Sequence, residues 1–196
     1  MEYEIRKYGS LDEEQKKQAV ELFMEGFGKM MTFAKDEELK KKLLFDIFDP
    51  SLFLCYTAEG KVLGLLGLAD SKARPLNFAP EACKKHFGNF RGGIISKQMN
   101  AVFQKPVVKA ADELYIDILV TGSAARRKGV GTALLQYAFG LEGYKSCLVH
   151  VFSNNRAAIS LYEKNGFAVE KREKWSLMRF LGAGSGYPVR MRRTVG

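Results

Sequence analysis

AARRKGVGTALL, residues 124–135, places three consecutive cations directly before two glycines, and an apolar run follows at helical spacing. This spacing predicts a loop that ends where a helix begins. The first N–H groups of a helix have no acceptor within it, and glycine lets a bulky anion approach them. Because Arg126, Arg127 and Lys128 add positive charge, the stretch predicts a site for a phosphate or a pyrophosphate.

The familiar nucleotide-binding loops do not match this stretch. No Lys-Ser or Lys-Thr pair follows a glycine, as a P-loop requires, and the G-x-G-x-x-G pattern of dinucleotide folds is absent from it. A solvated basic loop that caps an ordinary helix explains the same residues and stays open at this point.

Strands and helices are expected to alternate on both sides of the loop. Strands are expected at 1–8, in a hairpin at 51–70, at 113–121, at 146–152, near 167–180 and at 188–194. Helices are expected in two segments before residue 50, at 94–103, at 130–141 before Gly143, and at 156–166. The pattern predicts one mixed α/β domain over residues 1–196, and residues 71–109 are its least readable part.

Composition limits the class of protein. The chain has 196 residues, 46% of them hydrophobic, which is typical of a globular domain. Its most apolar stretch is interrupted at Glu59–Lys61, too early for a membrane span, and its first residues do not resemble a secretory signal. The three cysteines show neither disulfide nor metal-site spacing, so a cytoplasmic protein without a membrane partner is expected.

The net charge of +9 fits an anionic ligand, nucleic acid or simple solubility. Nucleic acid is not expected as the main partner, because the basic segments carry neither interleaved aromatic residues nor zinc-ligand spacing.

A second motif, NNRAAISLYEKNGF, lies one predicted strand downstream of the basic loop. Together the two stretches resemble the Gcn5-related N-acetyltransferases, whose signature R/Q-x-x-G-x-G/A is matched by Arg126, Gly129 and Gly131. The second signature of that family is N-x-x-A-x-x-L-Y-x-x-x-G-F. Its matching residues are Asn155, Ala158, Leu161, Tyr162, Gly166 and Phe167. The resemblance covers roughly residues 113–167.

The resemblance implies a single-domain α/β fold with a mixed, mostly antiparallel central sheet flanked by helices. Strands 4 and 5 of this sheet would splay apart to admit acetyl-CoA, the acyl donor, without a metal. The implied cofactor-binding residues are Leu119, Val120 and Thr121 for the pantetheine arm, Arg126, Arg127, Lys128, Gly129, Val130, Gly131 and Thr132 for the pyrophosphate, and Asn155, Ala158 and Tyr162.

This sequence departs from the family pattern in two places. Thr121 stands where valine is common, and TGSAA lacks the proline usual in the loop. Because both positions bind through the backbone, we expect a change in loop stiffness and retained cofactor binding.

The implied chemistry is transfer of an acetyl group to an amine. A backbone N–H near Leu119 or Val120 would polarise the thioester carbonyl. Tyr162 stands at the family's position for the acid that protonates the departing thiolate, and a phenol is protonated at neutral pH. Packing against the cofactor sulfur is the alternative role of Tyr162.

The amine must also lose a proton. Strand alternation predicts that Glu113, Tyr115, Asp117 and Leu119 share one face. Asp117 is a carboxylate in an apolar strand, so it is a candidate to orient the amine or accept its proton, and a buried ion pair is the alternative. Glu113 is the second candidate, and His150 is interpreted as structural.

The sequence therefore predicts an N-acetyltransferase that acts on a primary amine of a small molecule or peptide by direct attack in a ternary complex. An acyl-CoA-binding module or sensor with little transfer activity is the alternative, and a basic nucleic-acid-associated protein is a third class. The sequence does not identify the acceptor. A homodimer is compatible with the family, in which dimers are frequent.

Overall fold

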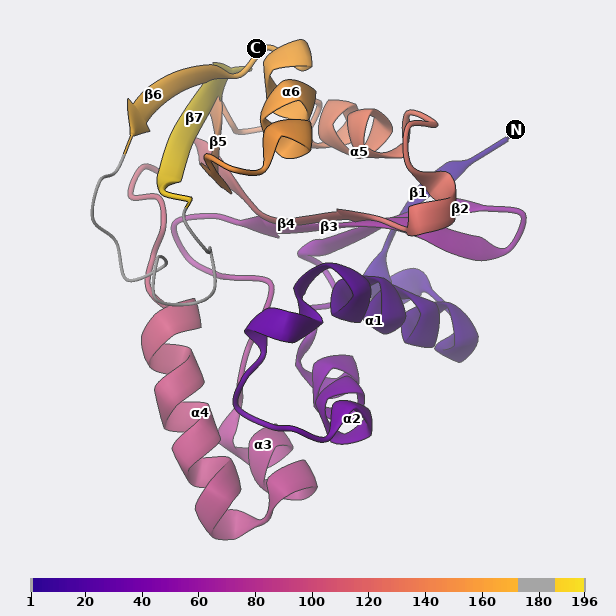
Figure 1. The fold of residues 1–196 in the computed structure, drawn as a ribbon, viewed down its shortest axis with the longest axis vertical. Coiled ribbons are helices and arrows are strands. Elements are labelled where there is room, and N and C mark those ends of the chain that lie inside the picture. Colours follow the sequence, from indigo (N-terminus) through magenta and orange to yellow (C-terminus); the bar gives the residue numbers. More distant parts are fainter. Residues whose placement is uncertain (1, 173–185, 196) are drawn as a thin grey trace.

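A seven-stranded sheet forms the centre of the computed structural model, which describes residues 2–172 and 186–195 (Figure 1). The strand order is β1-β2-β3-β4-β5-β7-β6, and only β4 and β5 pair in parallel. The strands are β1 (Glu4–Lys7), β2 (Phe53–Ala58), β3 (Lys61–Ala69), β4 (Glu113–Thr121), β5 (Ser146–Phe152), β6 (Ala168–Arg172) and β7 (Pro188–Thr194). The mixed, mostly antiparallel architecture is confirmed. Of the strand expected near 167–180, residues 168–172 form β6, and residues 173–180 lie outside the described residues.

Helices cover both faces of the sheet. The α-helices are α1 (Glu13–Phe27), α2 (Glu37–Ile47), α3 (Pro80–Phe87), α4 (Asn89–Phe103), α5 (Val130–Phe139) and α6 (Arg156–Lys164). Helices α1 to α4 lie on one side of the sheet, and α5 and α6 lie on the other (Figure 1).

Each face of the sheet has its own apolar core. Val20, Phe23, Leu43 and Phe53 are buried on the side of α1 and α2. Leu66, Ile116, Leu134 and Tyr162 belong to the core under α5 and α6. Because both faces are covered, β2 is buried at every position.

Two helix boundaries and one whole helix differ from the sequence-based prediction. Helix α5 ends at Phe139, and Gly140, rather than Gly143, is its C-cap residue. Helix α4 begins at Asn89, ahead of the expected 94–103, and α3 was not predicted. Helices α3 and α4 form a hairpin between β3 and β4, which we call the helical insert (residues 70–112).

Both described edges of the sheet are short and polar. β1 has the sequence EIRK, and β6 has the sequence AVEKR with every residue exposed. Within the described part of the chain, no helix is long and apolar enough to cross a membrane, and no cluster of His, Cys, Asp or Glu could hold a metal ion.

Candidate functional site

Strands β4 and β5 separate halfway along their length. Their parallel pairing ends at Ile116 opposite Val149, although β4 continues through residues 117–121. Over that stretch β4 pairs with β3 on one side, so its backbone groups on the β5 side lie at an open edge. Leu119, Val120 and Thr121 are therefore found along a gap between the strands, which matches the expected splay.

A β-bulge in β4 lies at the point of separation. Gly67 of β3 faces Ile118, whereas the next residue, Leu68, faces Ile116, so Asp117 is the extra residue. The bulge reverses the alternation of side chains beyond it.

The prediction that Leu119 shares one face of β4 with Glu113 and Tyr115 is therefore wrong, because Leu119 lies beyond the bulge. Tyr115 packs with Leu148 on the side of α1 to α4, but Leu119 packs against the core under α5 and α6. Ile118 and Val120 now point toward α1 and α2. Only the extra residue allows a strand to change faces in this way.

The loop after β4 has the backbone of an anion-binding site. Arg127 and Gly129 have φ angles of 61° and 84°, and Lys128 lies between them. Such a left-handed φ is uncommon for a residue other than glycine, so its occurrence at Arg127 points to a functional constraint. Alternating conformations of this kind turn successive N–H groups toward one concave side, which favours an anion.

Helix α5 begins directly after this loop. Its first backbone hydrogen bond joins the Ala133 N–H to the Gly129 carbonyl at 2.9 Å, so the amides of residues 130–132 have no acceptor within the helix. A Cβ on Gly129 would meet nothing within 4 Å, whereas one on Gly131 would lie 3.2 Å from the Leu161 side chain of α6. The loop is therefore open at Gly129 and closely packed at Gly131.

Glu25 connects the loop to α1. One of its carboxylate oxygens accepts hydrogen bonds from the Ser123 N–H at 3.1 Å and from the Arg126 guanidinium at 3.0 Å. Arg126, the first residue of the family signature, is thus held beside the loop by an acidic residue of another element. Sequence reasoning missed Glu25, because it lies far from the loop in the chain.

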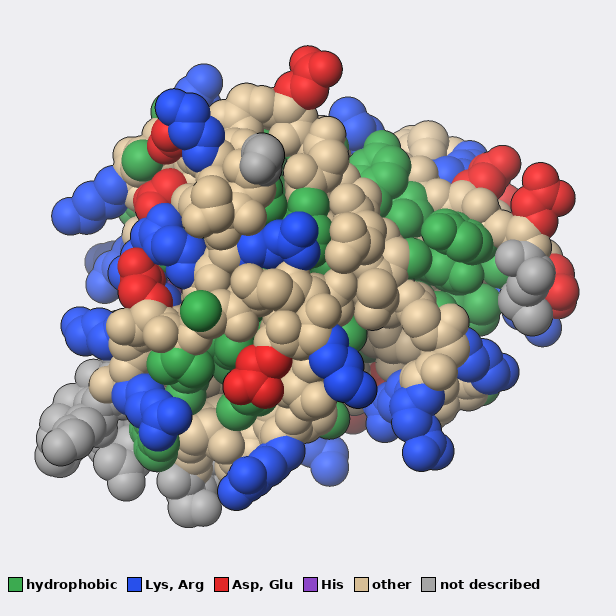
Figure 2. Space-filling model, turned by 90° about the horizontal axis from the view of Figure 1, so that it is seen from above, with side chains coloured by type: hydrophobic (Ala, Val, Ile, Leu, Met, Phe, Trp, Pro, Cys, Tyr) green, Lys and Arg blue, Asp and Glu red, His purple; other side chains and the backbone are tan. Residues whose placement is uncertain are grey.

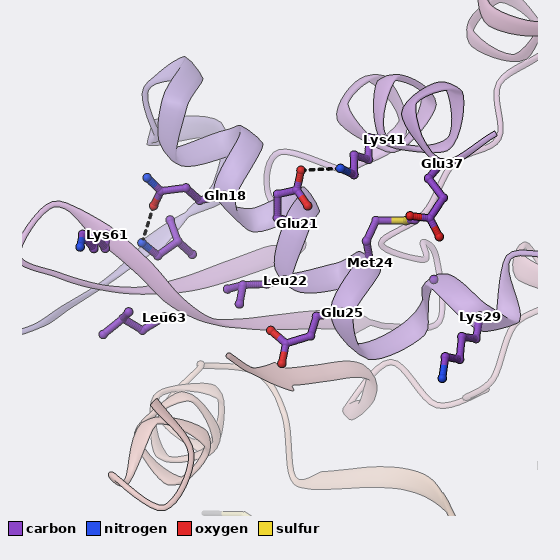
Figure 3. Close-up of a pocket in the computed structure, with 12 residues that line it drawn as sticks. Gln18, Glu21, Leu22, Met24, Glu25, Lys29, Glu37, Lys41, Lys61 and Leu63 are labelled. Atoms are coloured by element: carbon purple, nitrogen blue, oxygen red, sulfur yellow. Dashed lines mark hydrogen bonds and ion pairs between the residues drawn. The ribbon is translucent and has the colours of Figure 1, made fainter. Parts of the chain in front are cut away.

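A cavity of about 620 Å³ lies beside Glu25 (Figure 3). Its walls come from α1, the turn after α1, the first helical turn and middle of α2, and the start of β3. Glu21 and Lys41 form an ion pair across it at 2.8 Å. This cavity borders α1 rather than the gap between β4 and β5.

A second hollow, of about 670 Å³, opens on the other side of the loop. Lys128, Gly129 and Thr132 form one wall, and Tyr3 and Tyr137 contribute aromatic rings. Figure 2 shows the face of the molecule that carries α5 and α6, where lysine and arginine side chains are widely spread. The loop therefore has open space and positive charge around it.

Tyr162 comes from α6 and is buried in the core beneath that helix. Its ring contacts Phe167 edge-on, with 5.4 Å between centroids. Burial raises the pKa of the Tyr162 phenol well above its usual value, so the group keeps its proton at neutral pH.

Two asparagines fix the ends of α6. The Asn155 side chain accepts a hydrogen bond from the Ala158 N–H at 3.1 Å, which caps the helix. The buried Asn165 side chain donates to the Leu161 carbonyl at 2.8 Å and accepts from Gln136 of α5 at 3.1 Å. Asn165 therefore positions α6 against α5, a role that only the burial of this polar residue reveals.

Both predicted carboxylates are held in ion pairs. Asp117 receives two hydrogen bonds from Arg74, at 2.7 and 2.8 Å, and both side chains are largely buried. Glu113 pairs with Arg192 at 2.8 Å. Partial burial acts to raise the pKa of Glu113, but its hydrogen bond and ion pair with Arg192 outweigh this and lower it. Their catalytic roles stay predictions.

A tyrosine–histidine pair lies where β4 and β5 separate. The Tyr115 hydroxyl and His150 Nδ1 are 3.0 Å apart, and His150 directly follows Val149, the last residue of β5 that pairs with β4. Burial raises the pKa of Tyr115, and the neighbouring Asp117 and Tyr162 raise it further. The structure thus brings together two residues that sequence reasoning had not linked.

Comparison with known proteins agrees with this geometry. A model of the acetyltransferase (GNAT) family matches residues 17–167. No curated protein matches the sequence.

Solved structures share the fold at low sequence identity. An N-acetyltransferase from Staphylococcus aureus Mu50 has a TM-score of 0.62 and 19% identity, covering 96% of this chain and 99% of that chain. A GCN5-related N-acetyltransferase from Kribbella flavida has a TM-score of 0.62 and 19% identity, covering 98% of each chain. The ribosomal-protein-S18-alanine N-acetyltransferase from Escherichia coli has a TM-score of 0.55 and 15% identity, covering 100% of this chain and 95% of that chain. At these identities the likeness shows the fold.

Proposed function

The chain belongs to the acetyltransferase (GNAT) family, and on that premise we propose that it is an N-acetyltransferase that moves an acetyl group from acetyl-CoA to a primary amine of a small molecule or peptide. The observation that carries the proposal is the anion-binding loop, with Arg127 and Gly129 in left-handed conformations, at the end of an open strand edge.

The residues around the gap fit acetyl-CoA. The amides of residues 130–132 and the side chains of Arg126 and Lys128 suit a pyrophosphate, and Gly129 leaves space for it. The open backbone edge at residues 119–121 suits the amide groups of a pantetheine arm, which would hydrogen-bond to it as an added strand does. Asn155 and Ala158 form the capped start of α6, and in this proposal they also bind acetyl-CoA.

When bound, acetyl-CoA supplies an activated acetyl group. A backbone N–H of Leu119 or Val120 donates a hydrogen bond to the acetyl carbonyl oxygen as negative charge develops there. The Tyr162 hydroxyl gives its proton to the departing thiolate, and its raised pKa means that the group is a phenol rather than a phenolate at neutral pH.

The Tyr115–His150 pair accepts the proton that the amine loses. In this proposal the Tyr115 oxygen takes the proton of the amine while its own proton passes to His150 Nδ1, 3.0 Å away. Asp117 is less suited to this role because Arg74 occupies both of its oxygens.

Replacing Tyr162 with phenylalanine tests the proposed acid. We expect Tyr162→Phe to lower turnover about 100-fold, since a positioned acid contributes at least that much. Isothermal titration should give an acetyl-CoA affinity close to that of the native protein, because the ring and its packing against Phe167 remain. Unchanged turnover would assign the acid to another group.

The function itself is tested by titrating acetyl-CoA into the native protein and then measuring thiol release with a panel of amines. Binding followed by amine-dependent thiol release supports the proposal. Binding without thiol release in the presence of any amine favours the acyl-CoA sensor. No binding of acetyl-CoA excludes both the N-acetyltransferase and the sensor.

Replacing His150 tests the tyrosine–histidine pair. His150→Gln should lower turnover about 100-fold, because the amide side chain cannot take the proton that the Tyr115 hydroxyl releases. His86→Gln is the matched control, since the only other histidine of the sequence lies on α3 and pairs with Asp46. Unchanged turnover in His150→Gln would contradict the assignment.

A further inference from the structure

The helical insert joins two strands that are adjacent and antiparallel. Strands β3 and β4 pair directly, so a short turn would connect them. Instead, residues 70–112 leave the sheet, form α3 and α4, and return (Figure 1). Helices α3 and α4 extend away from the sheet on the side of α1 and α2.

The insert carries much of the positive charge of the protein. Residues 70–112 contain eight lysines and arginines against three acidic residues, Asp70, Glu81 and Asp112, whereas the whole chain has a net charge of +9. Seven of these eight cations are exposed, and the exception is Arg74. Lys85 forms an ion pair with Asp46 of α2.

Helix α4 has an exposed face that combines apolar and basic residues. The face is made of Phe90, Ile94, Lys97 and Ala101 of α4 and of Lys105, which directly follows the C-cap residue Gln104. These residues follow one another at intervals of three or four residues and are all exposed. Phe90 is 84% exposed and Ile94 is 42% exposed. No other described large hydrophobic residue is as exposed as Phe90. We call these five residues the α4 face.

The two ends of the insert, where it leaves and rejoins the sheet, are fixed against the site. Arg74 binds Asp117 in the bulge of β4 and also donates a hydrogen bond to the Lys105 carbonyl at 3.0 Å. Val108 packs against Tyr115, the residue next to His150. The α4 face therefore begins beside the gap between β4 and β5 and runs away from it.

We propose that the α4 face docks an acidic polypeptide whose N-terminal amine is the acetyl acceptor. The inference rests on the proposed function and names the class of its substrate. Exposed cations attract carboxylates, and Phe90 and Ile94 provide apolar anchors of the kind that dominate protein interfaces.

The length of α4 sets the reach of this contact. Its 15 residues span about 22 Å at 1.5 Å per residue. An extended peptide rises about 3.3 Å per residue, so about seven residues would cover the helix. With position three of the acceptor beside Lys105, position seven would lie beside Lys97, because eight helical residues span about the length of four extended ones.

A peptide fits this surface better than a nucleic acid. Non-specific binding of single strands uses several aromatic rings that stack on successive bases. On the α4 face Phe90 is the aromatic residue, and Ile94 and Ala101 offer no stacking surface. The mixture of aliphatic and charged side chains suits a polypeptide.

The test compares peptides of equal length that share their first two residues and then carry acidic, neutral or basic residues. We expect kcat/KM for the acidic peptide to exceed that for the neutral one about tenfold and to decline with salt. In Lys97→Glu/Lys105→Glu this preference should disappear, while a dipeptide with the same first two residues is acetylated as before. Lys7→Glu, an exposed lysine of β1, is the control.

Fluorescence anisotropy of a labelled acidic peptide measures docking without acetyl transfer. If the peptide docks and the double variant loses it, but no amine is acetylated, the proposed function fails and the docking surface stands. Equal affinity for acidic and neutral peptides, or displacement of the acidic peptide by a single-stranded RNA that binds more tightly, would overturn the inference.

Discussion

Gly129→Glu should abolish acetyl-CoA binding, with a loss of affinity of more than about 100-fold by isothermal titration, which is about 3 kcal/mol. Gly129 has a φ of 84°, which places a side chain under strain. A carboxylate there would also stand among the amides that open α5, where it repels and displaces a pyrophosphate.

Gly143→Glu is the matched control for this result. Gly143 has a φ of 89°, and a Cβ there would also meet nothing within 4 Å, so the backbone strain is similar. It lies after α5, at the opposite end of the helix from the loop. Both variants should lose similar stability in thermal unfolding, but Gly143→Glu should bind acetyl-CoA normally. If Gly143→Glu also lost acetyl-CoA binding, backbone strain rather than the position of Gly129 in the loop would explain the effect.

Arg74→Leu should lower the free energy of unfolding by about 3 kcal/mol, measured by urea denaturation. The Arg74 and Asp117 side chains are 10% and 12% exposed, so removal of the cation leaves a buried carboxylate without its partner. The carbonyl of Lys105 also loses a donor. The loss should therefore be much larger than for an exposed ion pair.

A double variant separates the cost of the stranded charge from the loss of the contact itself. Arg74→Leu/Asp117→Leu should recover part of the stability lost in Arg74→Leu, because no buried charge remains. Lys17→Leu breaks the exposed pair between Lys17 and Glu13 and should change stability by less than about 1 kcal/mol. A double variant less stable than Arg74→Leu would contradict this account.

The sheet and its flanking helices α5 and α6 could be predicted because each carries a strong local signal. The apolar strand at 113–121, the glycines at 129 and 131, and the Asn155 cap all lie close in sequence to the elements that they define. The gap between β4 and β5 was expected from the family resemblance, and the end of strand pairing confirms it.

The helical insert was hard to predict because its local signals conflict with its fold. Gly92 and Gly93 lie inside α4, and glycine weakens a helix prediction. At Gly92 a Cβ would lie 2.5 Å from the Cys83 carbonyl oxygen of α3, so close packing requires the glycine. That requirement depends on a tertiary contact, which the sequence of α4 does not reveal.

The bulge at Asp117 and the Tyr115–His150 pair also depend on partners far along the chain. The alternating sequence of β4 gives no sign of an extra residue, since the bulge is defined by its register against Gly67 and Leu68. His150 is separated from Tyr115 by α5. Only the parallel pairing of β4 with β5 brings the two together.

The short polar edges of the sheet bear on how copies of this protein meet in concentrated solution. Strands with unpaired edges recruit further strands, and charged residues on a brief edge oppose this. β1 carries Glu4, Arg6 and Lys7, and β6 carries Glu170, Lys171 and Arg172. Within the described residues, neither border offers a long apolar template for fibrils. Self-association by sheet extension is thereby disfavoured, and the helical surfaces remain for any symmetric dimer.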